Sequence, residues 1–170
     1  MKAPAGRNGL VLFVDYDGVL HHSNVYWGAE EGFYLRAPER YRLFQHADLL
    51  AEILAPFPEV KIVLSTSWAV RYSVPNAAKH LPPDLRARVI GGTFDASHRT
   101  KDEFQHTTRG QQVIADVQRR QPRGWLALDD NEEGWAGHEA HFVQTHMYEG
   151  ISDPDVLKTF KTKLQKMCRQ

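Results

Sequence analysis

The sequence has almost no cysteine, no long apolar run and no net charge, and each absence excludes a class of protein. Cys168 is the only cysteine among 170 residues, so no disulfide can form within the chain, which suits a reducing compartment. The apolar run nearest the N-terminus, residues 10–14, is too short for a signal-peptide core or a membrane span. We therefore expect a cytoplasmic protein with no membrane partner.

Charge and length restrict the organisation further. Lysine plus arginine and aspartate plus glutamate both total 21, so the whole chain has no electrostatic attraction for nucleic acid, and any such affinity has to be local. A length of 170 residues suits one domain with one buried core. No internal repeat or low-complexity segment divides the sequence. We expect a single domain over residues 1–170.

Strand-like and helix-like segments alternate along the chain. Three apolar runs have the continuous hydrophobicity of parallel strands buried on both faces: residues 10–14, 60–64 and 125–128. Apolar residues at helical spacing lie between and after these runs, at 43–54, 109–117 and 156–167. Weaker strand signals occur at 88–92 and 141–145. This alternation predicts an α/β fold, Rossmann-like, with a parallel sheet flanked by helices and right-handed crossovers.

Polar clusters follow the three apolar runs directly. The clusters are Asp15-Tyr16-Asp17-Gly18, Ser65-Thr66-Ser67-Trp68 and Asp129-Asp130-Asn131. A fourth cluster, Arg109-Gly110, opens one of the expected helices. Ligands of open α/β sheets bind where the carboxyl ends of the strands converge, so we expect the four clusters to form one site.

The residue types in these clusters suit phosphoester hydrolysis. One carboxylate of the pair Asp15 and Asp17 can attack phosphorus to form an acyl-phosphate, while the other protonates the leaving oxygen and later activates water. Gly18 lets the chain turn away directly after them. Clustered carboxylates need a hard divalent cation such as Mg²⁺, for which Asp129 and Asp130 supply further oxygen ligands.

A phosphoryl group also needs donors and a cation. Ser65 supplies a hydroxyl and Arg109 a positive charge for the phosphoryl oxygens, and Gly18 and Thr66 are further candidates for phosphate binding. Each cluster alone has an ordinary explanation as a turn, a helix cap, a solvated first-turn residue or a polar loop. Their joint occurrence at the expected strand and helix ends favours one site.

Together the clusters resemble the motifs of the haloacid dehalogenase (HAD) superfamily, specifically its aspartate-nucleophile phosphatases. The resemblance implies that Asp15 is the nucleophile and Asp17 the general acid/base. It also implies that Asp129 and Asp130 are metal-binding carboxylates, with Asp15 and Asp17 completing the set of metal ligands and Mg²⁺ as cofactor. Ser65 matches the hydroxyl of the second motif, with Thr66 as the alternative.

The basic third motif departs from the usual pattern of the superfamily. Arg109 lies 20 residues before Asp129, at the start of the helix that precedes the last motif strand. The resemblance places a lysine there in most members, and the planar fork of arginine is not equivalent to a point-charge ammonium. Lys101 is the alternative candidate for this role.

The intervals between motifs leave no room for a cap domain. Asp17 and Ser65 are 48 residues apart, Ser65 and Arg109 are 44 apart, and expected core elements take up most of both intervals. Only a flap at about residues 21–37 remains. The resemblance therefore implies a capless member with an open site, as in enzymes that act on the ends of macromolecules or on phosphoproteins.

Local phrases narrow the resemblance to one group. Residues 65–68, 88–93 and 128–130 are similar to the HAD domain associated with Swiss Army Knife RNA repair proteins. This similarity implies a phosphorylated substrate, with RNA or DNA ends as candidates. A phosphoprotein phosphatase and a non-catalytic phosphate- or RNA-binding module of the same fold remain alternatives, and the sequence does not define the oligomeric state.

The flap is rich in aromatic side chains. These rings, beside a cation, could stack an unpaired terminal base, or they could pack on the core, which we expect for Phe33 and Tyr34. We interpret His21 and His22 as histidines that touch substrate or solvent, because no second spaced His/Cys pair supports a zinc site. Trp68 is expected to be a packing residue near the mouth of the site.

Overall fold

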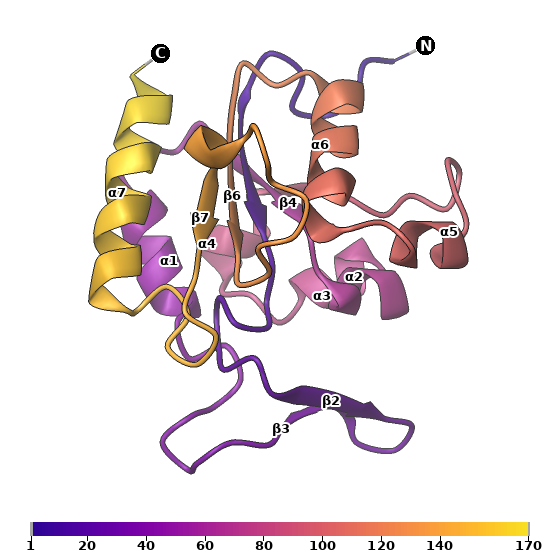
Figure 1. Ribbon diagram of the computed structural model, residues 1–170, viewed down its shortest axis with the longest axis vertical. Coiled ribbons are helices and arrows are strands. Elements are labelled where there is room, and N and C mark those ends of the chain that lie inside the picture. The colour runs from indigo at the N-terminus through magenta and orange to yellow at the C-terminus, as the bar shows by residue number, and fades with distance from the viewer. Residues whose placement is uncertain (1, 170) are drawn as a thin grey trace.

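Five parallel strands form the central sheet of the computed structural model, which describes residues 2–169 (Figure 1). The strand order is β5-β4-β1-β6-β7, so β1 lies in the centre, between the two strands that also lead into motif clusters. The strands are β1 (Leu10–Val14), β4 (Val60–Leu64), β5 (Val89–Gly92), β6 (Gly124–Asp129) and β7 (Phe142–Gln144). The expected Rossmann-like sheet is confirmed.

Helices cover both faces of the sheet. They are α1 (Ala47–Leu54), α2 (Ser67–Arg71), α3 (Val74–Ala78), α4 (Pro83–Arg86), α5 (Lys101–Gln105), α6 (Arg109–Arg120) and α7 (Pro154–Cys168), with a 3₁₀ turn η1 (Glu139–His141). Alternate residues of a strand point to opposite faces, and β1 divides its side chains accordingly. Leu10, Leu12 and Val14 pack in the core cluster under α1, α4 and α7, whereas Val11 and Phe13 pack in the cluster under α6.

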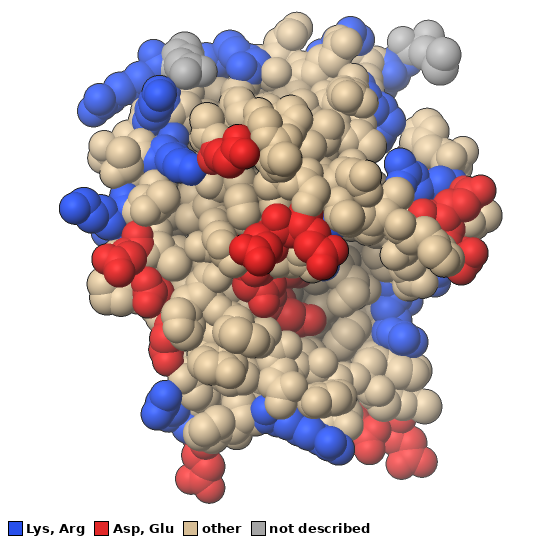
Figure 2. Space-filling model, in the orientation of Figure 1, with Lys and Arg blue, Asp and Glu red and all other residues tan. Residues whose placement is uncertain are grey.

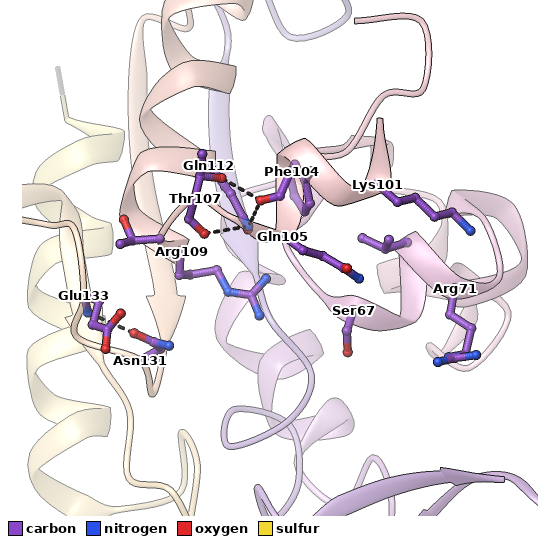
Figure 3. Close-up of a pocket in the computed structure, with 12 residues that line it drawn as sticks. Ser67, Arg71, Lys101, Phe104, Gln105, Thr107, Arg109, Gln112, Asn131 and Glu133 are labelled. Carbon is purple, nitrogen blue, oxygen red and sulfur yellow. Dashed lines mark hydrogen bonds between the residues drawn. The ribbon is translucent and has the colours of Figure 1, made fainter. Parts of the chain in front are cut away.

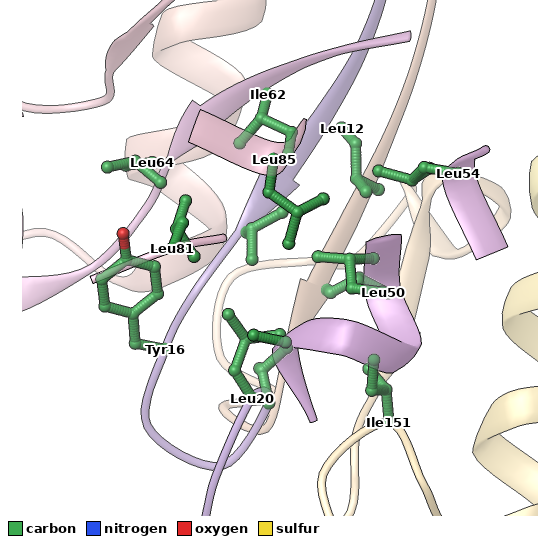
Figure 4. Packing of buried hydrophobic residues seen from close by; sticks show 14 of the residues in the cluster. Leu12, Tyr16, Leu20, Leu50, Leu54, Ile62, Leu64, Leu81, Leu85 and Ile151 are labelled. Carbon is green, nitrogen blue, oxygen red and sulfur yellow. The ribbon is translucent and has the colours of Figure 1, made fainter. Parts of the chain in front are cut away.

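The larger cluster reaches the loop that carries the first motif. Figure 4 shows leucines of α1 and α4 packed around β1 and β4, with Tyr16 at the edge of the cluster. Tyr16 is fully buried, and its hydroxyl donates a hydrogen bond to the carbonyl of Ala77 at 2.9 Å. Because Tyr16 anchors the loop in the core, its neighbours Asp15 and Asp17 are held at the end of the sheet.

The expected flap is an antiparallel hairpin that extends beyond the sheet (Figure 1). Its strands are β2 (Val25–Gly28) and β3 (Gly32–Leu35). Phe33 stacks on Trp68 with ring centroids 4.0 Å apart, so this ring joins the hairpin to α2 as expected. Tyr34 instead stacks on Tyr26 of the neighbouring strand, at 6.0 Å, and does not serve as a core contact.

Some boundaries differ from those expected. The helix predicted from residue 43 begins at Ala47, because residues 43–46 form turns in which Phe44 has a φ of 57°. The prediction did not include α5, which begins with a capping box formed by Thr100 and Glu103. Among residues 2–169, no helix is both long enough and apolar enough to span a membrane.

Candidate active site

Strand register brings three of the four clusters to one edge of the sheet. Val14, the last residue of β1, pairs with Leu64 on one side and Leu128 on the other. The residues that follow Val14, Leu64 and Leu128 are Asp15, Ser65 and Asp129, so these three lie side by side. Backbone hydrogen bonds also join the three segments at this edge. The amide of Ser65 donates to Val14 at 2.9 Å and the amide of Asp15 donates to Leu128 at 3.3 Å.

Arg109 joins these residues from the first turn of α6. Its Nε lies 3.1 Å from Asp129 Oδ2, its Nη2 lies 3.8 Å from Asp15 Oδ2, and its Nη1 donates to the carbonyl of Ser65 at 2.8 Å. Gly110 permits this position, since a Cβ there would lie 2.2 Å from the carbonyl oxygen of Gly134. A side chain at residue 110 would push α6 away from the loop that follows β6.

Lys101, the other candidate for the third motif, is placed differently. It begins α5 and lines the outer part of the cavity beside Arg109 (Figure 3). Among the described residues it forms no ion pair with Asp15 or Asp129. The geometry therefore assigns the contact with the carboxylates to Arg109.

Asp15, Asp129 and Asp130 form a group with carboxylate oxygens within 4.8 Å of one another. Asp130 approaches closely because residue 18 is a glycine with a φ of +77°, where a Cβ would lie 2.3 Å from Asp130 Oδ2. Asp129 Oδ2 is buried and, apart from its ion pair with Nε of Arg109, has no hydrogen-bond partner among the described residues. An oxygen-only set of this kind suits a hard divalent cation, so these three residues could hold Mg²⁺.

Burial makes it unfavourable for Asp15, Asp129 and Asp130 to be ionised together without a bound cation. Burial raises the pKa of Asp15 well above its usual value, Arg109 opposes the rise, and Asp129 adds to it. Burial likewise raises the pKa of Asp129 to about 7, again opposed by Arg109, and raises the pKa of Asp130. Two buried carboxylates and a third that is partly buried are unfavourable in their ionised forms beside one guanidinium, and a divalent metal would supply further positive charge.

Asp17, which we expected among the metal ligands, lies outside this group. Its Oδ1 is 2.8 Å from Nε2 of His21 and accepts a hydrogen bond from Nε1 of Trp68 at 2.9 Å. The amide of Phe44 donates to Nδ1 of His21 at 3.0 Å, so Nδ1 carries the lone pair and Nε2 carries the proton. Two donors thus converge on one oxygen of Asp17 and fix the carboxylate.

The prediction that His21 touches substrate or solvent was wrong, because its side chain is fully buried. His22 is also buried and stacks on Tyr148 at 4.7 Å. Trp68 packs as expected, and it also holds the Asp17 carboxylate through the hydrogen bond from its indole nitrogen. No sequence pattern indicated this contact, since Asp17 and Trp68 are 51 residues apart.

The proposed phosphate-binding residues fall into two groups. Ser65 Oγ is buried and has no hydrogen-bond partner among residues 2–169, and the backbone carbonyl of Ser65 accepts a hydrogen bond from Arg109. The amide of Gly18 already donates to the carbonyl of His21 at 2.9 Å, and Thr66 Oγ1 caps α2 by accepting from the amide of Trp68 at 3.3 Å. Ser65 and Arg109 are therefore the better placed of these residues to receive a phosphate.

Acidic side chains gather around a hollow in the middle of the face shown in Figure 2. A cavity of about 540 Å³ lies next to Arg109, with Asn131 and Glu133 on one side and Arg71 and Lys101 on the other (Figure 3). No second domain covers the site within the described part of the chain.

One comparison with known proteins found a match. Residues 11–156 match the model of a family described as the HAD domain in Swiss Army Knife RNA repair proteins. The match includes all four motif clusters. No curated protein and no solved structure matches the chain.

Proposed function

The chain belongs to the HAD domain family of Swiss Army Knife RNA repair proteins, and from this membership we propose that it is a Mg²⁺-dependent phosphomonoester hydrolase acting on phosphorylated nucleic-acid ends. The family supports a hydrolase of the phosphatase type. The finer proposal rests on one observation: the Asp15 carboxylate faces Arg109 and belongs to a group of three carboxylates that could hold a metal ion.

Asp15 is the proposed nucleophile. The amide of Tyr16 donates to its Oδ1 at 2.7 Å, whereas its Oδ2 faces Nη2 of Arg109. An attack by Oδ2 on phosphorus forms the aspartyl-phosphate and breaks the bond to the leaving oxygen. Arg109 and Ser65 would bind the nonbridging phosphoryl oxygens, whose charge they stabilise best in the transition state.

Asp17 is the proposed proton carrier. Because His21 and Trp68 both occupy Oδ1, the proton to be transferred belongs on Oδ2. Protonated Asp17 gives this proton to the leaving oxygen, and the resulting carboxylate takes a proton from the water that hydrolyses the aspartyl-phosphate. The two steps return Asp15 and Asp17 to their starting states and release inorganic phosphate.

Asp15, Asp129 and Asp130 are the proposed holders of Mg²⁺. The bound cation would neutralise the carboxylates and polarise the phosphoryl group. Asp129 is fixed for this role by the amide of Asn131, which donates to its Oδ1 at 2.9 Å, while its Oδ2 faces Nε of Arg109 at 3.1 Å.

The proposal is tested with an aryl phosphate and a panel of phosphorylated oligonucleotides, nucleotides and phosphopeptides. We expect hydrolysis that EDTA abolishes and Mg²⁺ restores, with the oligonucleotides as the best substrates. Activity that survives EDTA would exclude the metal-dependent mechanism. A preference for phosphopeptides would indicate a phosphoprotein phosphatase, and no hydrolysis of any phosphoester would favour a binding module.

A further inference from the structure

The cavity beside Arg109 has a volume of about 540 Å³, which is within the range of pockets that bind small ligands. It begins at Arg109, which contacts the proposed nucleophile, and extends to α2 and α5 (Figure 3). A substrate whose phosphate lies against Arg109 and Asp15 can therefore place its adjoining part in this cavity.

Two further cations line the cavity beyond Arg109. Arg71 is the last residue of α2 and Lys101 the first residue of α5, and the two elements come from separate parts of the chain. Among residues 2–169, neither side chain forms an ion pair with an acidic residue, although the chain as a whole has equal numbers of acidic and basic residues. Glu133 is the only acidic residue that lines the cavity in the described part of the chain.

The hairpin holds Arg71 in position. Its guanidinium carbon lies 3.8 Å from the centroid of the Trp27 ring, a close cation–π contact. The hairpin is itself fixed to α2 by the stack of Phe33 on Trp68. Trp27 is 40% exposed and offers an accessible aromatic surface next to Arg71, although it is not among the residues that line the cavity.

We infer that this cavity binds the nucleotide next to the phosphorylated end of a single-stranded RNA or DNA, with Arg71 and Lys101 contacting its phosphodiester. The inference rests on the proposed function and names a subsite for it. Positive charge that tracks a backbone, combined with an exposed aromatic ring, is the arrangement by which proteins bind single strands without sequence preference.

Charge favours a nucleic acid over a phosphopeptide at this subsite. The terminal phosphate already has Arg109, so two additional cations that have no acidic partner in the described part of the chain suit a substrate that carries a second negative charge close to the first. Each further nucleotide brings such a charge in its backbone, whereas a peptide with one phosphate brings one only where an acidic side chain lies near the phosphate. The exposed ring of Trp27 adds a surface that fits a base.

The subsite is tested by binding, which does not depend on turnover. The affinity of Asp15→Asn protein for short fluorescent single-stranded RNAs with a 3′- or 5′-phosphate is measured by anisotropy at several salt concentrations. We expect Arg71→Ala and Lys101→Ala each to weaken binding about fivefold or more and to reduce the salt slope by about 0.7, as for one lost phosphate contact on a single strand. The 3′ and 5′ probes show which end is bound.

Lys158→Ala is the matched control, since it removes one exposed lysine from α7, on the opposite side of the molecule from α5 (Figure 1). It should leave both the affinity and the salt slope unchanged. Equal affinities for Arg71→Ala, Lys101→Ala and the parent protein would overturn the inference, as would tighter binding of a phosphopeptide than of either RNA. Because aryl phosphate hydrolysis is measured separately with the wild-type protein, failure of the subsite and failure of the proposed function give different results.

Discussion

His21 offers the sharpest test of how the site works, because it touches Asp17 and has no direct access to a substrate. Its side chain is fully buried, and its Nε2–H lies 2.8 Å from Asp17 Oδ1. His21→Leu removes this donor while keeping an apolar side chain among the rings of Phe44 and Trp68. Asp17 then keeps only the hydrogen bond from Trp68.

The size of the effect follows from the bond that is lost. A hydrogen bond to a charged group contributes about 1.5–3 kcal/mol, which corresponds to roughly 10- to 100-fold in kcat/KM if the whole bond acts in the transition state. If Asp17 donates the proton to the leaving oxygen, the loss should be larger for an alkyl phosphate than for an aryl phosphate, whose leaving group needs little protonation. We therefore measure kcat/KM for both substrates, because this parameter does not include the later hydrolysis of the aspartyl-phosphate.

Two controls separate this role from a loss of packing. His21→Gln keeps a donor that can reach Asp17 and should recover part of the activity. His46→Leu replaces another buried histidine, one without a contact to Asp17, and should lower the stability without any dependence on the leaving group. Equal losses for both substrates with His21→Leu, or the same loss in an Asp17→Asn background, would refute the reasoning.

Three further predictions concern the charged groups of the site. Asp15→Asn and Asp17→Asn should both be nearly inactive, but mass spectrometry should detect a trapped phosphoenzyme only with Asp17→Asn, and an adduct with Asp15→Asn would reverse the assigned roles. Arg109→Ala should lower kcat by ~10²-fold or more, and Arg109→Lys should recover much of this loss in steady-state kinetics, although the different donor geometry limits the rescue. Burial raises the pKa of Asp129 from 3.8 to about 7, so the folded state holds this proton more tightly than the unfolded state and loses stability as the pH rises from about 4 through 7. In EDTA, the melting temperature of Asp129→Asn minus that of wild type should therefore increase from pH 5 to pH 8, and Mg²⁺ should reduce this increase. A difference that stays constant from pH 5 to pH 8 would contradict the raised pKa of Asp129.

The sheet and the ends of its strands could be predicted because their signals are local. Continuous apolar runs mark β1, β4 and β6, and the polar residues that follow them come to one edge because neighbouring parallel strands end together. The position of Arg109 was also predictable, since Thr108 and Gln111 form a capping box that defines where α6 begins. Signals of this kind depend on a few adjacent residues and survive without tertiary information.

The contacts of His21 and Trp68, the buried side chains that hold Asp17, could not be predicted, because they depend on tertiary packing. A histidine beside a motif loop is equally compatible with solvent, with substrate or with burial, and only the packing of Phe44 and Trp68 around His21 decides between them. The hairpin was difficult for the same reason. Phe33 and Tyr34 are adjacent in sequence and point to opposite faces of a strand, so only one of them can pack on α2.

Trp68 connects the hairpin to the proposed proton carrier, Asp17. Trp68 contacts Phe33 of the hairpin through its ring face and Asp17 through its indole nitrogen, and it follows directly from the second motif. A displacement of the hairpin would therefore move the residue that holds the proposed proton carrier. Phe33→Ala should lower kcat/KM more for an alkyl phosphate than for an aryl phosphate, as His21→Leu does, although Phe33 touches no group that reacts. If Phe33→Ala changes only the affinity for RNA, the hairpin positions the substrate alone and Trp68 keeps its orientation without it.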